Sequence, residues 1–184
     1  MNRKAVAYEI AKKLVLDLSA EDRNNALLSV WYMVDQQDID EGFDIHQVEF
    51  DAAIIDYFIR HEFDENINYG AFFDSAIIYV LALGYLIYNN SKLQQMYHDL
   101  YHTSLCIDED SRTYRLQCPC CGFYSLSLEP AWEICGICFW ENDGQAETKY
   151  SSVNRMTLLE YRQKFYEKHS KAVLEQKYIS DQSI

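Results

Sequence analysis

The sequence predicts a mainly α-helical fold that carries a small β module, an α+β architecture. Apolar residues repeat with the period of a helix through residues 4–102, and glycine and proline are few. Alternating apolar residues flank a pair of cysteines further along, which indicates short strands. We therefore expect an N-terminal helical bundle, short antiparallel strands around the cysteines and a C-terminal helix.

The cysteine spacing is the most specific pattern in the chain. Cys118 and Cys121 form one Cys-x-x-Cys pair, Cys135 and Cys138 form a second, and thirteen residues separate the pairs. Thiolates are soft ligands that suit zinc, which takes four ligands at the corners of a tetrahedron. Gly122 follows the first pair, where a tight turn needs a residue that tolerates positive φ. The spacing predicts one structural Zn²⁺ in a zinc-ribbon-like module.

Two cysteines lie outside this pattern. Cys120 stands between two ligands and must point away if both neighbours bind. A metal bound by Cys120 instead of Cys121 is an alternative, but it breaks the two-residue spacing. Cys106 is isolated, and we expect it to be a small buried apolar residue.

Five helices are expected before the cysteines, at residues 4–18, 20–34, 47–63, 71–88 and 91–102. The first two form a helical hairpin, and Ser19 with Asp22 resembles a capping box between them. The fourth is apolar nearly all round and should be the buried centre of the helical region. Its uncharged run, residues 76–88, is shorter than the roughly 20 residues of a membrane span, so we expect no membrane segment.

Strands and a last helix are expected after the polar segment 108–111. A hairpin surrounds the first cysteine pair, and the chain turns at Pro130 to return through residues 132–135. The last helix begins at Thr157, which forms a capping box with Glu160, and its apolar contacts extend to Tyr178 and Ile179.

Two regions follow from this pattern, an acidic helical region at 1–107 and a cysteine-rich module at 112–184. We expect them to pack as one unit because the linker is short. The chain has 184 residues, of which 49 % are hydrophobic and 15 % aromatic, enough for a packed core. Its basic start is not followed by the apolar run of a signal peptide. We therefore expect a reducing cytoplasm, where cysteines bind metal more often than they form disulfides.

Charge is distributed unevenly along the chain. The net charge is −13, and residues 1–110 carry all of it, with 7 basic and 20 acidic residues. Residues 35–65 hold 11 acids and one base, a net charge of −10. Such a field repels nucleic acid and attracts a basic partner, although a solvated face that only aids solubility is the alternative. The acids that we expect to bind a partner are Asp35, Asp38, Asp40, Glu41, Asp44, Glu49 and Asp56.

The segment after the second cysteine pair offers another contact surface. Phe139 and Trp140 precede Glu141 and Asp143, and Asn142-Asp143-Gly144 favours left-handed backbone. The two aromatic residues could cover the metal or dock onto the helices. In the functional interpretation, Trp140, Glu141 and Asp143 contact a partner.

Three motifs carry a family resemblance. They are Cys118-Pro119-Cys120-Cys121-Gly122, residues 133–145 (EICGICFWENDGQ), and Asn154-Arg155-Met156-Thr157-Leu158 with Glu160, Arg162 and Phe165. In these motifs, residues 116–165 resemble the bacterial cysteine-rich CPCC family. Gly136 stands where that family usually has proline, and Asn142 where it often has aspartate. The resemblance implies a zinc-binding role for the four paired cysteines. The helical leader resembles those of immunity proteins from contact-dependent and other polymorphic toxin systems.

Charge and resemblance together predict an immunity protein rather than an enzyme. It would neutralise a basic toxin, a nuclease, by occluding the toxin's active or substrate-binding surface. We expect neither nucleic acid nor a membrane as a partner. One alternative is a zinc-ribbon adaptor for nucleic acid or the transcription machinery, which needs a basic face that only the last helix offers. Another is an enzyme built on His98 and His102, which lie four residues apart and could share a metal.

Overall fold

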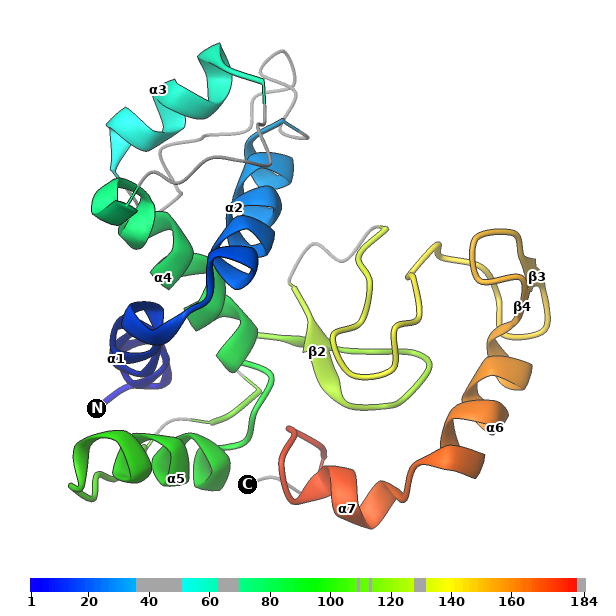
Figure 1. Cartoon of the computed structure of the whole chain (residues 1–184). Coiled ribbons are helices and arrows are strands. Elements are labelled where there is room, and N and C mark those ends of the chain that lie inside the picture. The colour runs from blue at the N-terminus through cyan, green and yellow to red at the C-terminus, as the bar shows by residue number, and fades with distance from the viewer. Residues whose placement is uncertain (36–50, 63–69, 109, 113, 128–131, 182–184) are drawn as a thin grey trace. The chain divides into compact units, whose positions relative to one another are not determined.

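The computed structural model describes residues 1–35, 51–62, 70–108, 110–112, 114–127 and 132–181. Within these residues helices dominate, and two short antiparallel sheets lie in the cysteine-rich part (Figure 1). The predicted α+β fold class is confirmed. The contacts between residues group the chain into two compact units, Ala7–Leu83 and Met1–Val6 with Gly84–Ile184. This grouping places the helix expected at residues 91–102 in the same unit as the cysteines. The predicted division of the chain into regions 1–107 and 112–184 stays a prediction.

The chain begins with two consecutive helices, as predicted, and their packing as a hairpin stays a prediction. Helix α1 (Arg3–Leu14) continues into the 3₁₀ turn η1 (Val15–Asp17), and α2 (Ala20–Asp35) follows. Ser19 Oγ accepts a hydrogen bond from the Asp22 N–H at 3.1 Å and donates to its carboxylate at 2.6 Å. The predicted N-cap is therefore confirmed, because the orphan N–H of the first turn finds its partner in the side chain.

Helix α3 spans Ala52–Arg60. The Asp51 carboxylate accepts from the Ala53 N–H at 2.9 Å and caps the first turn. The predicted start at residue 47 lies outside the described residues. The helix ends because His61 takes an extended backbone, with φ −128°. The α3 ring of Phe58 packs 5.3 Å from that of Phe73, which lies in the 3₁₀ turn η4 (Gly70–Phe73).

Helix α4 (Asp74–Tyr85) begins where Arg23 anchors it to α2. The Arg23 guanidinium pairs with the Asp74 carboxylate at 2.5 Å and donates to the Gly70 carbonyl at 2.6 Å. The buried residues of α4 are Ala76, Ile77 and Ile78, whereas its later residues are half-buried and Gly84 is exposed. The prediction of a fully buried helix is therefore wrong. Among the described residues, none of the helices combines the length and apolarity that a membrane crossing needs.

Arg3 is a buried anchor in the other unit. Its side chain is fully buried and donates to the carbonyls of Leu86 at 3.2 Å and Tyr88 at 2.6 Å, and to the Asn90 side chain. These contacts fix the turn before α5 (Asn90–Tyr101). The Asn89 side chain caps α5 by accepting from the Lys92 N–H at 2.9 Å. A residue that the sequence presents as part of a basic N-terminus is thus a core contact.

Two short hairpins lie in the cysteine-rich part of the chain. Strand β1 (Leu116–Gln117) pairs antiparallel with β2 (Tyr124–Leu126) around the first cysteine pair, as predicted. A second hairpin, β3 (Tyr150–Ser151) with β4 (Met156–Thr157), was not predicted, because each strand is only two residues long. The turn expected at Pro130 lies outside the described residues.

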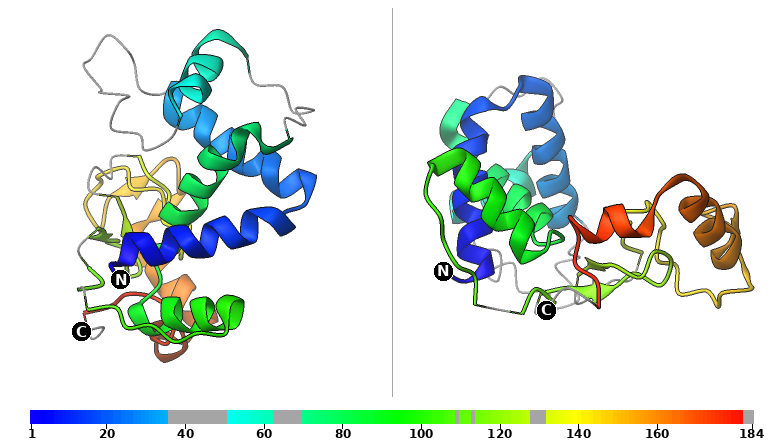
Figure 2. Two further views of the ribbon diagram at one scale, coloured as in Figure 1. Left: turned by 90° about the vertical axis from the view of Figure 1, so that its left-hand side faces the viewer. Right: turned by 90° about the horizontal axis from the view of Figure 1, so that it is seen from below.

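The C-terminal helix is two helices rather than one. Helix α6 (Leu158–Lys168) starts at the predicted capping box of Thr157 and Glu160 and ends because His169 is extended. Helix α7 (Lys171–Glu175) follows after this break, as Figure 2 shows. The prediction of one helix through to Ile179 is therefore wrong. Ile179 instead donates its N–H to the Ile87 carbonyl at 3.2 Å and accepts from the Tyr124 N–H at 2.9 Å, which fastens the end of the chain to β2.

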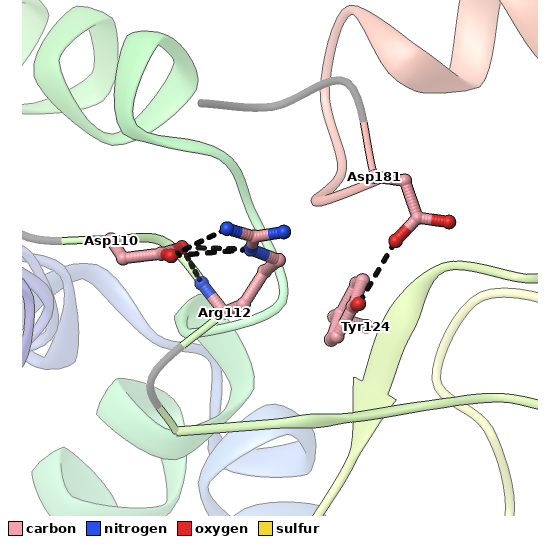
Figure 3. A network of polar contacts seen from close by, with 4 residues as sticks. All are labelled: Asp110, Arg112, Tyr124 and Asp181. Atoms are coloured by element: carbon pink, nitrogen blue, oxygen red, sulfur yellow. Dashed lines mark hydrogen bonds and ion pairs between the residues drawn. The ribbon is translucent and has the colours of Figure 1, made fainter.

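Side chains near the predicted linker add two further contacts (Figure 3). The Asp110 carboxylate accepts from the Arg112 guanidinium at 2.7 Å, and this hydrogen bond lowers the pKa of Asp110 to about 2. On β2, the Tyr124 hydroxyl donates to Asp181 at 2.9 Å and thereby fixes the chain beyond α7. The hydrogen bond to this carboxylate raises the pKa of Tyr124.

Candidate metal centre

The four paired cysteines meet in one buried cluster. The sulfurs of Cys118, Cys121, Cys135 and Cys138 all lie within 4.8 Å of one another. The Cys118 and Cys138 sulfurs are 3.8 Å apart, and those of Cys121 and Cys135 are 3.7 Å apart. A tetrahedron with metal–sulfur bonds of about 2.3 Å has edges of about 3.8 Å. The cluster therefore has the dimensions of a tetrahedral thiolate site.

The first cysteine turn is held by its own backbone. The Gly122 N–H donates to the Cys118 carbonyl at 2.9 Å, and the Cys118 N–H donates to the Phe123 carbonyl at 2.8 Å. Gly122 takes φ +73°, which glycine adopts at no steric cost. This left-handed residue reverses the chain directly after Cys121, so that both sulfurs point to the same side.

The second cysteine turn repeats this geometry. The Phe139 N–H donates to the Cys135 carbonyl at 2.9 Å, and the Cys135 N–H donates to the Trp140 carbonyl at 2.9 Å. Phe139 occupies the position equivalent to the glycine of the first turn and takes φ +63°. The two Cys-x-x-Cys turns thus form matching halves of the site, although a bulky residue fills the left-handed position in the second.

Three polar groups contact the Cys135 sulfur in addition to the other thiols of the cluster. The Ser125 hydroxyl lies 2.9 Å from its sulfur, and the N–H groups of Ile137 and Cys138 donate to it at 3.4 Å each. Ser125 lies on β2 and is buried. These donors stabilise a thiolate, because each one places a partial positive charge against the sulfur.

The four thiols cannot all ionise here without a cation. Hydrogen bonding to the Cys118 sulfur raises the pKa of Cys121 far above its usual range. Donation from Cys118, Cys121 and Cys138 lowers the pKa of Cys135 far below its usual range. One thiolate is therefore favoured at the expense of its neighbours, whereas a divalent metal ion stabilises all four at once. The donor set and its geometry fit a soft divalent ion with a complete shell of four protein ligands.

Helix α6 holds the first cysteine turn through Arg162. Its Nε donates to the Cys120 carbonyl at 3.0 Å, and its Nη2 donates to the Pro119 carbonyl at 2.6 Å. The same Nη2 pairs with Glu147 at 2.6 Å. One guanidinium therefore donates to two carbonyls of the tight turn.

Two tyrosines of α6 hold both turns. The Tyr161 hydroxyl donates to the Cys138 carbonyl at 2.9 Å, and the Tyr166 hydroxyl donates to the Cys121 carbonyl. Burial raises the pKa of Tyr166 to about 12, so its hydroxyl keeps the proton that it donates. Phe165 lies between them in sequence and is buried against the cysteines. The capping box at Thr157 sets the phase of α6 and so directs these side chains to the metal centre.

Asn154 holds the chain that leaves the second turn. Its side-chain oxygen accepts from the Glu141 N–H at 2.9 Å, and its Nδ2 donates to the Glu141 carbonyl at 2.9 Å. The Asn154 side chain therefore pairs with the Glu141 backbone as a neighbouring strand would. The sequence placed Asn154, Arg162 and Phe165 in the family motifs, but their spatial roles could not be inferred from spacing.

Cys120 and Cys106 differ from each other in burial. Cys120 is buried beside the metal centre but is not among the four clustered sulfurs, so the alternative in which it replaces Cys121 is not what the structure has. Cys106 is exposed, and its thiol donates to Asp108 at 3.1 Å, which raises the pKa of Cys106. The expectation of a buried Cys106 is wrong, because the chain after α5 runs over the surface at this point.

Trp140 is not a surface residue. It is 1 % exposed and packs with the cysteines, and its ring lies 5.2 Å from that of Tyr161. The left-handed turn at Phe139 sends that side chain outward and returns Trp140 to the core. The prediction that Trp140 offers a contact surface is therefore wrong, because Trp140 covers the cysteine cluster. Glu141 and Asp143 are half-buried.

The predicted acidic surface is described only in part. Asp56 is exposed on α3, as are Asp51 and Glu62 on either side of it. The backbone of Asp35 ends α2, and its side chain lies outside the described part. The remaining acids that we expected to bind a partner, Asp38, Asp40, Glu41, Asp44 and Glu49, lie outside the described residues.

The histidine pair is not part of a metal cluster. In the part of the chain that the structure describes, one group of three or more potential ligands converges, and it is the cysteine cluster. His98 is exposed and lies 3.8 Å from Asp99, and His102 ends α5 in the left-handed conformation with φ +53°. The enzyme built on these histidines stays an untested alternative.

We expect Ser125→Ala to weaken metal binding about tenfold, because it removes a hydroxyl from the Cys135 sulfur. Competition with a chromogenic chelator measures this affinity. Ser127→Ala is the matched control, since Ser127 contacts Glu133 through its backbone N–H and keeps that contact. Equal affinity in the two variants would mean that the hydroxyl does not tune the metal ligand.

Comparison with known proteins supports the family resemblance for the cysteine-rich part. Residues 116–177 match the family described as Cysteine-rich CPCC. The match begins at β1, contains both cysteine turns and α6, and ends just after α7. Neither a curated protein nor a solved structure matches the chain.

Proposed function

We propose that this chain is a zinc-stabilised immunity protein that binds and neutralises a basic bacterial toxin, a nuclease. The zinc ion is structural, because four buried thiolates fill its shell and leave no position for water or substrate. The protein acts by binding, with no catalytic residues of its own, and occludes the active or substrate-binding surface of the toxin.

The observation that carries this proposal is the concentration of negative charge. Residues 35–65 have a net charge of −10, while residues 111–184 have as many basic as acidic residues. A nuclease binds a polyanion and therefore has a positive surface, to which a negative protein surface is complementary. Such complementarity accelerates association, which an inhibitor of a lethal enzyme requires.

The described part of the acidic segment is available for contact. Asp56 and Glu62 are exposed. Asp56 pairs with Arg60 at 2.8 Å, but both side chains are more than half exposed. An exposed pair of this kind contributes about 0.2–1 kcal/mol, so the fold does not depend on it.

A pull-down from the encoding bacterium tests the proposal, with the zinc-loaded protein as bait at low and high salt. We expect one basic toxin domain, retained near one-to-one and less strongly at high salt. The purified bait should then inhibit the nuclease activity of that domain. Retention of nucleic acid or transcription proteins alone would contradict the proposal and favour the adaptor alternative.

Charge reversal identifies the surface that attracts the toxin. We expect Asp56→Lys with Glu62→Lys to slow association by about tenfold at low salt and by less at high salt. Stopped-flow or surface binding kinetics measure the rate. Glu167→Lys is the control, because it reverses an exposed negative charge on α6. If both proteins associate at the wild-type rate, the acidic segment does not steer the toxin.

A further inference from the structure

Two exposed aromatic residues near the second cysteine turn occupy backbone positions that suit glycine. Trp132 takes φ +61° and Phe139 takes φ +63°. Their side chains are 64 % and 71 % exposed. A left-handed backbone is unfavourable for a bulky residue, and an exposed side chain recovers little of that cost by packing. The fold by itself gives no reason for an aromatic residue at either position.

The first cysteine turn has glycine at the position where the second one has Phe139. Gly122 fills the position equivalent to Phe139, with the same hydrogen bond back to the first cysteine of its pair. In the first turn the left-handed position is occupied by glycine, which adopts it without strain. In the second turn the same position is occupied by phenylalanine, for which this backbone conformation is unfavourable. The difference lies in the side chain that Phe139 presents to solvent.

Trp132 sits at a β-bulge. Its N–H donates to the Asn142 carbonyl at 2.9 Å, and the Asn142 N–H donates to the Glu133 carbonyl at 2.9 Å. Trp132 and Glu133 on one side of the hairpin therefore both pair with Asn142 on the other. Glycine normally fills the left-handed first position of such a bulge. A bulge also changes the direction of its side chain, and here it presents an indole to solvent.

Ile134 adds a third apolar side chain to this hairpin. It pairs across the hairpin with Glu141 and is 57 % exposed. The adjacent pair, Cys135 and Trp140, is buried, so Ile134 and Glu141 lie on the outward side. The three exposed apolar residues are Trp132, Ile134 and Phe139, and we name them the anchor surface.

The segment that carries the anchor surface contains acidic but no basic residues. Residues 131–148 contain four acids and no base. Glu133 is 4.0 Å from Arg115, and Glu147 pairs with Arg162, so these two serve the fold. Glu141 lies opposite Ile134, and Asp143 follows two residues later. An apolar centre with acidic neighbours is complementary to an apolar pocket with a basic rim.

We propose that the anchor surface docks a basic protein partner by inserting Phe139 and Trp132 into an apolar pocket of that partner. The natural partner would be the toxin, so the proposal rests on the proposed function for the partner's identity. A metal bound by Cys135 and Cys138 would stabilise the turn between them, and this turn fixes the backbone of Phe139. Rigid aromatic anchors of this kind lose little entropy on binding.

Glycine variants separate the contribution of the two side chains to binding from their contribution to the stability of the fold. Phe139→Gly and Trp132→Gly remove the side chain where the backbone favours glycine, so we expect the melting temperature to rise by about 2 °C in each. Circular dichroism of the zinc-loaded protein measures it. A lower melting temperature would show that the side chains stabilise the fold, and it would overturn the proposal.

A displayed library of random peptides serves as the binding probe on the zinc-loaded protein. We expect enriched peptides that combine aromatic or aliphatic residues with Lys or Arg. Binding should be at least about tenfold weaker to the double variant, which carries both Phe139→Gly and Trp132→Gly. Leu16→Ser is the control, because Leu16 is 72 % exposed in the other unit and should leave binding unchanged. No enrichment, enrichment of acidic peptides, or equal binding to the double variant would each overturn the proposal.

The toxin distinguishes a failure of this inference from a failure of the proposed function. If the chain captures a toxin whose affinity the double variant leaves unchanged, the anchor surface is refuted and the immunity function stands. If the peptides bind as expected and no toxin is captured, the immunity function fails and the anchor surface stands.

Discussion

Loss of one metal-binding cysteine should unfold the cysteine-rich part of the protein. We expect Cys121→Ser to bind far less than one zinc per chain and to lose the near-UV circular dichroism of the buried Trp140. A structural zinc site contributes about 10–16 kcal/mol of apparent binding free energy, which is as large as the whole stability of most domains. The two hairpins are too short to compensate for that loss.

Two other cysteines supply the controls for this experiment. Cys106→Ser changes an exposed thiol and should retain one zinc per chain. Cys120→Ser changes a buried thiol outside the cluster and should also retain the metal, with some loss of stability. If Cys120→Ser lost the metal while Cys121→Ser kept it, the ligand set would be the alternative one. Metal analysis of the purified variants decides between them.

Arg162→Met should cause the second largest effect on the fold. The substitution keeps the apolar stem and removes the donors to Pro119 and Cys120. A hydrogen bond from a charged group contributes about 1.5–3 kcal/mol, so we expect a loss of roughly 2–3 kcal/mol in the free energy of unfolding. Urea denaturation of the zinc-loaded protein measures it, and the melting temperature should fall by about 5 °C.

Two further variants separate the stabilisation that Arg162 provides through the two carbonyls from that of its ion pair with Glu147. Lys164→Met removes an exposed charge from the same helix and should change stability by less than about 0.5 kcal/mol. Glu147→Gln removes only the ion pair, and because Glu147 is more than half exposed we expect a loss below about 1 kcal/mol. If Glu147→Gln equals Arg162→Met, the ion pair and not the two carbonyls makes Arg162 important.

Features that depend on neighbours in sequence were predictable. The Cys-x-x-Cys pairs close a local turn, the Ser19 cap bonds within its own helix, and the capping box of Thr157 and Glu160 spans three residues. For such features the partner lies within a few residues, so the spacing already contains the geometry. The hairpin around the first cysteine pair follows for the same reason, because its strands are joined by the turn.

Other predictions failed because a distant residue decides them. The break between α6 and α7 is followed by contacts of Ile179 with β2 and with Ile87. Arg3 is buried only because the carbonyls of Leu86 and Tyr88 stand where the turn before α5 brings them. No periodicity within residues 1–18 contains that information. The exposure of Phe139 and the burial of Trp140 likewise depend on the left-handed backbone at Phe139. The sequence alone does not predict that conformation, because phenylalanine rarely adopts it.

The fold class, the four clustered cysteines and the concentration of negative charge could be predicted from the residues alone, because ligand spacing, helical periodicity and composition are local or additive properties. Three features required the folded chain: α6 holds both cysteine turns, Ser125 supports the Cys135 sulfur, and Phe139 rather than Trp140 meets solvent. These contacts join residues far apart in sequence, and their formation depends on the packing of the whole cysteine-rich core.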